Sequence, residues 1–347
     1  MTARVATLAQ QVVRWQTQYG RHHLPWQQTR DPYRVWLSEI MLQQTQVTTV
    51  LDYYERFLQR FADVTALAHA SEDEVLALWS GLGYYSRARN LHRCAQMVVA
   101  QHGGAFPSSA QALALLPGIG RSTAGAIAAF CFSERVPILD ANVKRVLTRW
   151  LGFDADLALA ANERRLWDHA QTLLPQDDLA HAMPRYTQGL MDLGATICLS
   201  RKPVCAQCPL QDGCVAARQG EPERYPVKTR KLVRKAQSWW LLVLRDGAGR
   251  VWLHKRPATG IWAGLHCLPV FEAREQLLAH PAILAAPQVT ELPAFLHVLT
   301  HRDLYLHPVL ASSTVGVPVG EDGGWFDAGQ WRQIGLPAPV RKFLENW

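Results

Sequence analysis

The stretch from Leu115 to Val146 reads LLPGIGRSTAGAIAAFCFSERVPILDANVKRV and joins two segments with helical patterns. Its residues 117–120, PGIG, predict a tight turn, because glycine adopts backbone conformations that a side chain obstructs. Backbone N–H groups that point outward from such a turn form a concave site for an anion, for example a nucleic-acid phosphate. An apolar run then ends abruptly at Asp140. The stretch therefore predicts a phosphate-binding hairpin followed by a carboxylate at the start of a helix.

Each of these features also has a simpler interpretation. A Pro-Gly-x-Gly segment is often only a turn, and an Asp that opens a helix is often only its N-cap. Together, however, LPGIGR and ILDANVKR resemble the helix-hairpin-helix family of DNA glycosylases. This resemblance implies that Asp140 is catalytic and that Asn142 supports the sugar or positions water. The DNA contacts it implies in this stretch are Gly118, Gly120 and Lys144.

Composition indicates an ordinary folded protein of two or three domains, at roughly 150 residues for each domain. The chain has 347 residues, of which 48% are hydrophobic, and a net charge of +7. Residues 1–235 hold 27 Lys and Arg against 20 Asp and Glu, whereas residues 236–347 hold 9 of each. The basic excess therefore lies in the first part, as binding to a polyanion requires. The sequence shows neither a signal peptide nor a membrane-spanning apolar run, so a cytoplasmic, bacterial-type location is expected.

Residues 35–47, VWLSEIMLQQTQV, predict a helix with Glu39, Gln43 and Gln46 on one face. A helical Glu most often lies in a solvated stripe. Here the surroundings are apolar, and burial would raise the pKa of Glu39 toward the range of a general acid. The string LSEIMLQQTQV closely resembles the corresponding helix of the MutY-type adenine DNA glycosylases. That resemblance implies that Glu39 is the catalytic acid and that a nearby Gln, Gln44, enters the base stack.

Residues 81–85, GLGYY, predict a turn after a short helix. Leu82 is expected to act as an apolar wedge toward DNA, because such side chains stabilise a kinked duplex. A helix end with inward-packed tyrosines is an equally good interpretation of this segment alone. The family resemblance places Tyr84 in the duplex beside the damaged base, and Arg87 is expected to contact phosphate.

Four cysteines near the end of the helical region have the spacing C-x6-C-x2-C-x5-C. Zinc usually takes two closely spaced pairs of ligands, whereas this run has one close pair and two outlying thiols. Four thiolates in one short run suit a [4Fe–4S] cluster. The same spacing occurs in the cluster loop of the endonuclease III and MutY branch. The expected ligands are Cys198, Cys205, Cys208 and Cys214.

Beyond residue 236 the pattern changes to strands, at 239–244, 251–255, 295–300 and 303–310, with a helical segment at 272–279. The layout resembles a Nudix-type α/β domain but lacks the dense Glu cluster that binds Mg²⁺, since only Glu272 and Glu275 are present. MutY proteins carry such a domain, which reads 8-oxoguanine through a loop of the type Phe-Ser-His. The matching residues here are Leu299, Thr300 and His301, of which Leu299 departs from the family pattern. Thr300 and His301 are therefore the expected lesion contacts.

The expected chemistry is hydrolysis of the bond between adenine and deoxyribose. Glu39 would protonate the base and later activate water, while Asp140 would stabilise the cationic sugar, as paired carboxylates do in glycosidases. Adenine must leave the duplex to react. By family match, its pocket would contain Trp26, Gln27 and Gln188. Ser122 stands where bifunctional relatives have a nucleophilic Lys, so the sequence predicts a monofunctional glycosylase.

The predicted architecture is an all-α helix-hairpin-helix glycosylase domain with an iron–sulfur loop, joined to an α/β Nudix-like domain. The expected boundaries are 1–216, a linker at 217–236, and 237–347. Within the first domain, the hairpin region spans about 27–137, and the iron–sulfur subdomain combines about 1–26 with 138–216. The predicted partner is double-stranded DNA with adenine opposite 8-oxoguanine or guanine, and nothing in the sequence suggests more than a monomer.

Three other functions are alternatives to this interpretation. A thymine-glycol-type lyase has the same fold, but Ser122 and the C-terminal domain argue against it. A non-catalytic iron–sulfur protein that binds DNA would release no free adenine. A nucleotide pyrophosphatase would need the missing Glu cluster.

Overall fold

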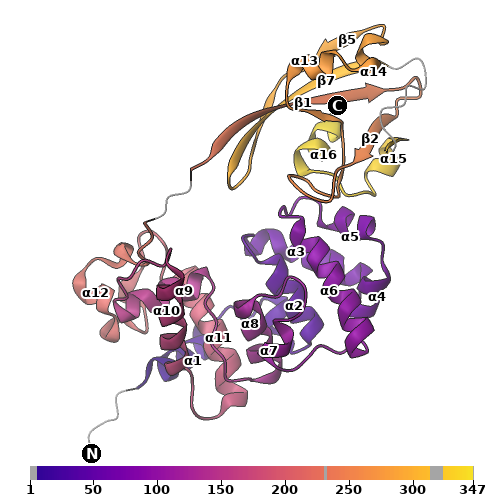
Figure 1. Cartoon of the computed structure of the whole chain (residues 1–347). Helices are drawn as coiled ribbons and strands as arrows, with labels where there is room; N and C mark the ends of the chain where they lie inside the picture. Colours follow the sequence, from indigo (N-terminus) through magenta and orange to yellow (C-terminus); the bar gives the residue numbers. More distant parts are fainter. Residues whose placement is uncertain (1–5, 230–232, 313–322, 347) are drawn as a thin grey trace, which may run out of the picture. The chain divides into compact units, whose positions relative to one another are not determined.

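The computed structural model describes residues 6–229, 233–312 and 323–346, and it contains a helical part and a part built on a sheet (Figure 1). The chain divides into two compact units. The first comprises Met1–Val50, Asp63–Thr65 and Arg93–Lys231, and the second comprises Leu51–Ala62, Ala66–His92 and Leu232–Trp347. No helix within the described ranges is long and apolar enough to cross a membrane.

The described residues before the sheet form α-helices and short 3₁₀ turns. The α-helices up to the start of the sheet are α1 (Leu8–Tyr19), α2 (Pro32–Met41), α3 (Val47–Arg60), α4 (Val64–His69), α5 (Glu72–Trp79), α6 (Ser86–His102), α7 (Ala110–Leu113), α8 (Arg121–Phe132), α9 (Ala141–Leu151), α10 (Ala160–Thr172), α11 (Leu179–Thr196) and α12 (Val215–Gln219). Short 3₁₀ turns are η1 (Pro25–Gln27), η2 (Cys205–Gln207), η3 (Gln211–Gly213) and η4 (Pro222–Arg224).

The single helix predicted for residues 35–47 is wrong. Helix α2 ends at Met41 and α3 begins at Val47. Between them Gln44 has a φ of 57°, a left-handed conformation that no helix continues through. Gln43 and Gln46 therefore do not share a helical face with Glu39. The amphipathic pattern suggested continuity because the break is made by a backbone conformation rather than by Gly or Pro.

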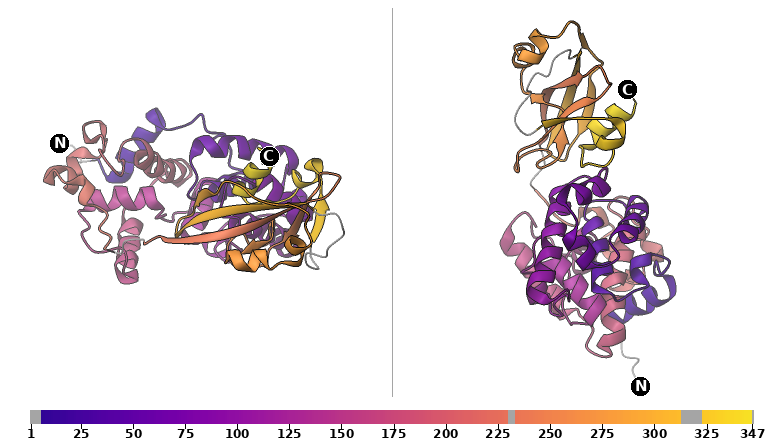
Figure 2. Two further views of the ribbon diagram at one scale, coloured as in Figure 1. Left: turned by 90° about the horizontal axis from the view of Figure 1, so that it is seen from above. Right: turned by 90° about the vertical axis from the view of Figure 1, so that its right-hand side faces the viewer.

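Helix α11 is the element around which the first unit packs. It lies against α1, α8 and α9, and Figures 1 and 2 show these helices side by side. Buried side chains from several helices form its core, including Val12, Val143 and Leu190. A Cβ atom on Gly194 of α11 would lie 2.5 Å from the Cβ of Asn142, so the close approach of α9 requires glycine there.

The second unit contains an eight-stranded sheet among the described residues, with the main order β3-β2-β1-β7-β5. Strands β1 and β7 pair in parallel along their whole lengths, from Lys235 opposite Arg302 to Arg245 opposite Ser312. The strands are β1 (Lys235–Arg245), β2 (Val251–Lys255), β3 (His266–Cys267), β4 (Val270–Phe271), β5 (Val289–Glu291), β6 (Phe295–Val298), β7 (Arg302–Ser312) and β8 (Gly323–Phe326). The accompanying helices are α13 (Arg274–Leu278), α14 (Pro281–Leu284), α15 (Ala328–Trp331) and α16 (Ala338–Glu345).

The sheet has a core of its own, in which Leu242 and Leu244 of β1 pack with Val309 of β7 and with Leu277 of α13. Strands β1, β2, β6 and β7 and helix α13 lie where the sequence predicted strands and a helix. The linker expected at 217–236 contains the end of α12, the turn η4 and the start of β1, and its residues 230–232 lie outside the described residues.

Candidate functional site

Asp140 begins helix α9, immediately after the apolar run of the opening stretch. Its backbone is extended, and its Oδ1 accepts a hydrogen bond of 2.6 Å from the Val143 N–H. Burial raises the pKa of Asp140, while the N–H groups of Val143 and Asn142 and the charges of Arg145 and Lys144 oppose that rise. The start of a helix favours a negative charge. This carboxylate is thus withdrawn from water but surrounded by groups that favour its ionised form.

Glu39 lies in the last turn of α2 and lines a pocket of about 320 Å³. Burial, and after it the negative charge of Asp140, raise the pKa of Glu39 to about 8. The structure therefore brings the two predicted catalytic carboxyl groups within electrostatic reach of each other. A carboxyl group with this pKa carries its proton at neutral pH, as a general acid must.

The pocket beside Glu39 contains all three residues expected to receive adenine. Trp26 and Gln27 come from η1, and Gln188 comes from α11. Trp26 and Gln188 are buried, whereas Gln27 is half-buried. Residues far apart in the sequence therefore line the same cavity as Glu39, the candidate proton donor.

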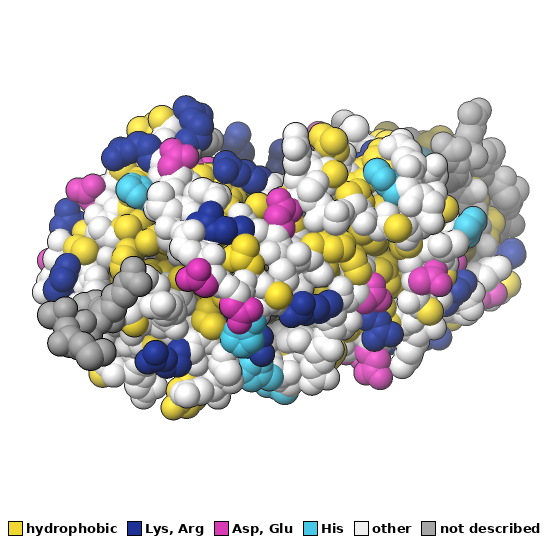
Figure 3. Space-filling view, turned by 90° about the horizontal axis from the view of Figure 1, so that it is seen from below, with side chains coloured by type: hydrophobic (Ala, Val, Ile, Leu, Met, Phe, Trp, Pro, Cys, Tyr) yellow, Lys and Arg dark blue, Asp and Glu magenta, His cyan; other side chains and the backbone are white. Residues whose placement is uncertain are grey.

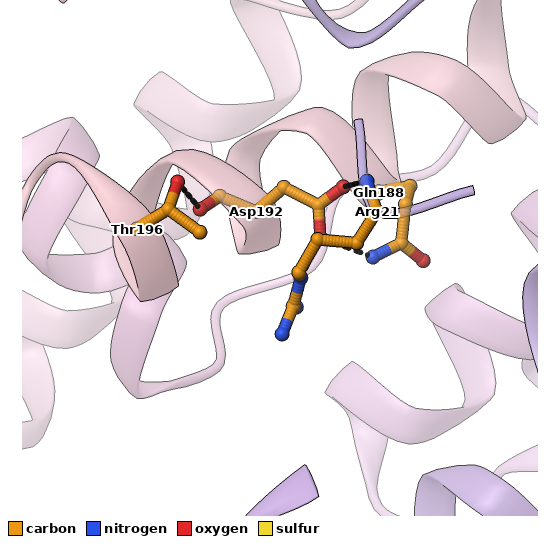
Figure 4. A network of polar contacts seen from close by, with 4 residues as sticks. All are labelled: Arg21, Gln188, Asp192 and Thr196. Carbon is orange, nitrogen blue, oxygen red and sulfur yellow. Dashed lines mark hydrogen bonds and ion pairs between the residues drawn. The ribbon is translucent and has the colours of Figure 1, made fainter. Parts of the chain in front are cut away.

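Gln188 belongs to a buried polar network that the sequence did not suggest (Figure 4). Its Nε2 donates to the carboxylate of Asp192, which also forms an ion pair with Arg21. Thr196 donates to the backbone carbonyl of Asp192. Arg21 and Asp192 lie 171 positions apart in the sequence, so no local signal indicates that they pair.

The predicted hairpin forms the turn before α8. Gly118 has a φ of 77°, which glycine adopts without strain, and Gly120 is the N-cap of the helix. Ser122 Oγ accepts a hydrogen bond of 3.1 Å from the Leu139 N–H, next to Asp140. Ser122 thereby holds the backbone next to Asp140, the candidate catalytic carboxylate, through a contact that the sequence did not predict.

Two polar residues on α9 are held by neighbouring side chains. Asn142 Oδ1 accepts a hydrogen bond of 2.6 Å from Arg145 Nη2, and Arg145 Nε donates to the carbonyl of Cys198 at 2.7 Å. Lys144 forms an ion pair with Glu163 of α10. On the face drawn in Figure 3, Lys and Arg side chains of the described residues are dispersed among acidic ones rather than gathered in one stripe.

The four predicted cluster ligands line one small cavity: Cys198, Cys205, Cys208 and Cys214. The buried Arg149 donates through Nη1 to the sulfur of Cys198 at 3.3 Å and accepts through its carbonyl from the thiol of Cys214 at 3.4 Å. Among the described residues, no group of three or more His, Cys, Asp and Glu side chains is arranged to hold a single metal ion. A tetrahedral zinc with bonds of about 2.3 Å would draw its sulfurs within roughly 4 Å of one another. In a [4Fe–4S] cluster each thiolate binds a different iron, so thiols spaced around a cavity fit it better.

Two residues expected to contact DNA are buried instead, in the second unit. Leu82 is only 6% exposed, so it is no surface wedge. Arg87 is 8% exposed, and its Nη2 donates to the carbonyls of Leu82 and Gly83 at 3.1 and 3.2 Å. The arginine thus stabilises the GLGYY turn rather than offering its charge to phosphate. The turn was predictable from its glycines, but which of its side chains point inward was not.

Gln44 and Tyr84, the two residues expected to enter the duplex, are both exposed non-glycine residues with a positive φ, 57° and 48°. Such conformations are uncommon outside glycine and often occur at functional sites. Thr300, expected to contact the lesion, belongs to the same compact unit as Tyr84, and their hydroxyl groups share a hydrogen bond. His301 is exposed.

Comparisons with known proteins agree with this architecture. Residues 37–170 match the family model described as HhH-GPD superfamily base excision DNA repair protein, and residues 240–346 match a NUDIX domain. The adenine DNA glycosylase of Buchnera aphidicola subsp. Acyrthosiphon pisum is 36% identical over 345 residues, which cover 98% of this chain and 97% of the relative. The rat adenine DNA glycosylase is 44% identical over 224 residues, covering 62% of this chain and 42% of that protein.

Among solved structures, a thermostable thymine-DNA glycosylase is similar with a TM-score of 0.53 and 28% identity, covering 61% of this chain and 95% of that one. An endonuclease III bound to DNA has a TM-score of 0.51 at 19% identity, covering 61% of this chain and 94% of that one, and shows the fold alone. The fold and the matches define a base-excision DNA glycosylase, an enzyme that hydrolyses N-glycosidic bonds in DNA. The chain belongs to the adenine DNA glycosylase family, the MutY type, and so removes adenine from DNA.

Proposed function

We propose that this glycosylase removes adenine mispaired with 8-oxoguanine or guanine in double-stranded DNA, acting as a monomer in the cytoplasm. The main support for the chemistry is the electrostatic coupling of Glu39 and Asp140. Glu39 lines the pocket with a pKa of about 8, and the negative charge of Asp140 contributes to that rise. Two carboxyl groups in different environments perform the same division of work in glycoside hydrolysis.

The proposed reaction begins when adenine leaves the base stack and enters the pocket formed by Trp26, Gln27 and Gln188. Glu39 donates its proton to adenine N7, which makes the base a better leaving group. The bond between C1′ and N9 then breaks, and its electron pair leaves with the base. Asp140 stabilises the positive charge that remains on the sugar. Glu39, now deprotonated, takes a proton from the water that attacks C1′, with Asn142 as a candidate to support the sugar or orient that water.

Hairpin residues Gly118 and Gly120 are proposed to hold a phosphate, and Gln44 and Tyr84 to enter the duplex. Lys144 is a further candidate contact, although its amine is shared with Glu163. The cavity lined by Cys198, Cys205, Cys208 and Cys214 is proposed to hold a [4Fe–4S] cluster, which would cross-link this loop and stabilise its fold. Arg201 and Lys202 lie within the same loop and would face DNA.

Ser122 supports a monofunctional reaction, because its hydroxyl accepts from the Leu139 N–H and no amine stands at this position. Borohydride reduction would trap an imine between a lysine and the abasic sugar. We expect only a trace of this trapped complex. If Lys144 forms the imine, the trace should be absent in Lys144→Ala. A stoichiometric trapped complex would contradict a monofunctional enzyme.

Thr300 and His301 are the proposed contacts to 8-oxoguanine. The decisive experiment compares duplexes that carry adenine opposite 8-oxoguanine, guanine or thymine under single-turnover conditions, with chromatographic detection of the free base. We expect rapid adenine release opposite 8-oxoguanine, slower release opposite guanine and none opposite thymine. Equal rates for all three would reject lesion specificity. Release of thymine glycol with strand cleavage, from a fourth duplex that carries this base, would favour the lyase alternative.

A further inference from the structure

One face of helix α9 lines the cavity that contains the four predicted cluster ligands. Val146, Arg149 and Trp150 stand at positions i, i+3 and i+4, a spacing that places side chains on the same side of a helix. Arg149 is buried, and its Nη1 donates a hydrogen bond to the Cys198 sulfur at 3.3 Å. This face of the helix therefore directs one donor at a predicted ligand of the cluster.

Trp150 brings a second N–H group to the same cavity. Its Nε1 is buried and has no hydrogen-bond partner among the residues that the structure describes. The atom lies against Gly213, the residue before Cys214, because a Cβ atom on Gly213 would be 3.0 Å from it. Buried N–H groups without a partner are destabilising and rare in folded proteins. The indole therefore lacks an acceptor that a group bound in the cavity can supply.

Packing against a glycine does not by itself indicate a missing acceptor. In the sheet, the Nε1 atom of Trp252 is also buried with no partner in the described part of the chain, and a Cβ atom on Gly323 would be 2.7 Å from it. Trp252 is not among the residues that line the cavity of the four cysteines, whereas Trp150 is. The cavity is thus what distinguishes Trp150, and Trp252 provides a matched control.

We infer that Trp150 donates a hydrogen bond from Nε1 to a sulfur of the proposed [4Fe–4S] cluster and thereby raises the reduction potential of the cluster. This inference rests on the cluster assignment made under the proposed function. When bound, the cluster supplies thiolate and sulfide sulfurs, which accept hydrogen bonds. A donor beside these sulfurs stabilises the more negative, reduced state, so each such bond makes reduction easier. Trp150 thus acts on the cluster without being an iron ligand.

The experiment measures the one-electron reduction potential of the purified holoprotein by film voltammetry, together with its iron and sulfide content. Trp150→Phe keeps an aromatic ring but removes the N–H group. We expect its potential to become more negative by about 59 mV, which corresponds to a roughly tenfold change in the ratio of oxidised to reduced cluster. Trp252→Phe, the matched change in the sheet, should leave the potential unchanged.

The sign of the shift separates a hydrogen bond from simple packing. The Phe ring is smaller than the indole and leaves space for water, and water beside the sulfurs favours the reduced state. Loss of packing alone would therefore make the potential more positive, whereas loss of the donor makes it more negative. An unchanged or more positive potential in Trp150→Phe, with full iron content, would overturn the inference.

A second measurement uses the unaltered chain and so does not depend on whether Trp150→Phe retains its cluster. In holoprotein labelled with ¹⁵N in the tryptophan indoles, the N–H group that donates to the cluster should have a hyperfine-shifted resonance that moves with temperature. The shift arises because unpaired spin density reaches the indole through the hydrogen bond. The lack of any such indole resonance would overturn the inference. If the wild type contains no iron and sulfide, the proposed cluster fails instead.

Discussion

Carboxyl groups have different surroundings in the first compact unit (the helical unit) and in the sheet domain, which comprises β1 to β8 and α13 to α16. In the helical unit, Glu39 and Asp140 are half-buried, and their pKa values are raised. In the sheet domain, Glu272 and Glu275 are exposed, and Glu291 forms a surface ion pair with Arg274. Surface pairs of this kind contribute little to stability, about 0–1 kcal/mol. The helical unit thus holds two carboxyl groups in surroundings that change their pKa, whereas these three glutamates of the sheet domain face solvent.

This difference supports the proposal that catalysis takes place in the helical unit and that the sheet domain serves recognition. A pyrophosphatase would need clustered carboxylates in the sheet domain to bind Mg²⁺. Among the residues that the structure describes, no such cluster of metal-binding side chains occurs. Incubation with 8-oxo-dGTP and Mg²⁺ is therefore expected to yield no monophosphate. The predictions that follow test the same contrast, from the largest expected effect to the smallest.

Glu39→Gln is expected to have the largest effect. The amide keeps the shape of the side chain but has no proton to donate, so single-turnover adenine release should fall by roughly 10²–10⁴-fold. Glu272→Gln, the matching change at an exposed position of the sheet domain, should leave the rate unchanged. Comparable losses in both variants would remove the distinction between the two regions.

Replacing any one of the four loop cysteines should lower cluster content and stability. In Cys198→Ser the iron and sulfide per chain should fall well below four each, and the visible absorption of the cluster should fade. The fold of the loop should weaken as well, because metal binding and folding are coupled. Cys131→Ala, at a cysteine outside the loop, should retain both signals. Full iron content in the Cys198 variant would reject this ligand assignment.

The pH dependence of adenine release should follow the protonation of Glu39. Above a pH of about 8 the acid loses its proton, so the rate should decline by about tenfold for each further pH unit. At low pH, protonation of Asp140 should lower the rate as well. The pH–rate profile should therefore be bell-shaped, and its two apparent pKa values belong to the coupled pair of carboxyl groups rather than to either residue alone. A rate that is flat from pH 7 to 10 would contradict Glu39 as the acid.

The same raised pKa has a consequence for stability. Glu39 has a pKa of about 8 in the folded chain against an ordinary value of 4.5, so between these values the folded state binds more protons than the unfolded state. The free energy of unfolding should therefore fall as pH rises from about 4.5 to 8 and then level off, by a total on the order of 5 kcal/mol. Denaturant unfolding of Glu39→Gln should lack this contribution, and parallel pH curves for the two proteins would contradict it.

Thr300→Ala should have the smallest effect. Loss of one hydroxyl contact to the lesion is worth roughly 1 kcal/mol, so adenine release opposite 8-oxoguanine should slow by about fivefold. Release opposite guanine should not change, because guanine lacks the 8-oxo group. An equal loss with both partners would place Thr300 outside lesion recognition.

The sequence predicted local features of the site better than long-range ones. The glycines of the hairpin, the helix that begins at Ala141 and the pairing of Glu39 with Asp140 all follow from residue types next to one another or from the family resemblance. The break between α2 and α3 was not predictable from residue types, because the positive φ of Gln44 makes it rather than a Gly or Pro. The sequence also failed where a surface residue type is buried, as with Arg87, whose guanidinium serves nearby carbonyl groups.

The contacts that hold the pocket in shape had no signal in the sequence. Arg21 and Asp192 meet only because α11 folds back onto the segment after α1, and either residue alone resembles an ordinary surface charge. The bond from Leu139 to Ser122 has a similar origin, because it joins residues 17 positions apart. Such pairs depend on tertiary packing, which a single sequence does not reveal.

Asp140 is the N-cap of α9, so only some substitutions would remove its charge without also weakening the helix. Alanine there would remove the carboxylate and also the helix cap, at a cost of about 1 kcal/mol. Asparagine is as good a cap as aspartate, so it would take away the charge alone and leave the architecture intact. Under the proposed mechanism, Asp140→Asn should therefore give an inactive protein that still binds its DNA, which would be useful for capturing the bound complex.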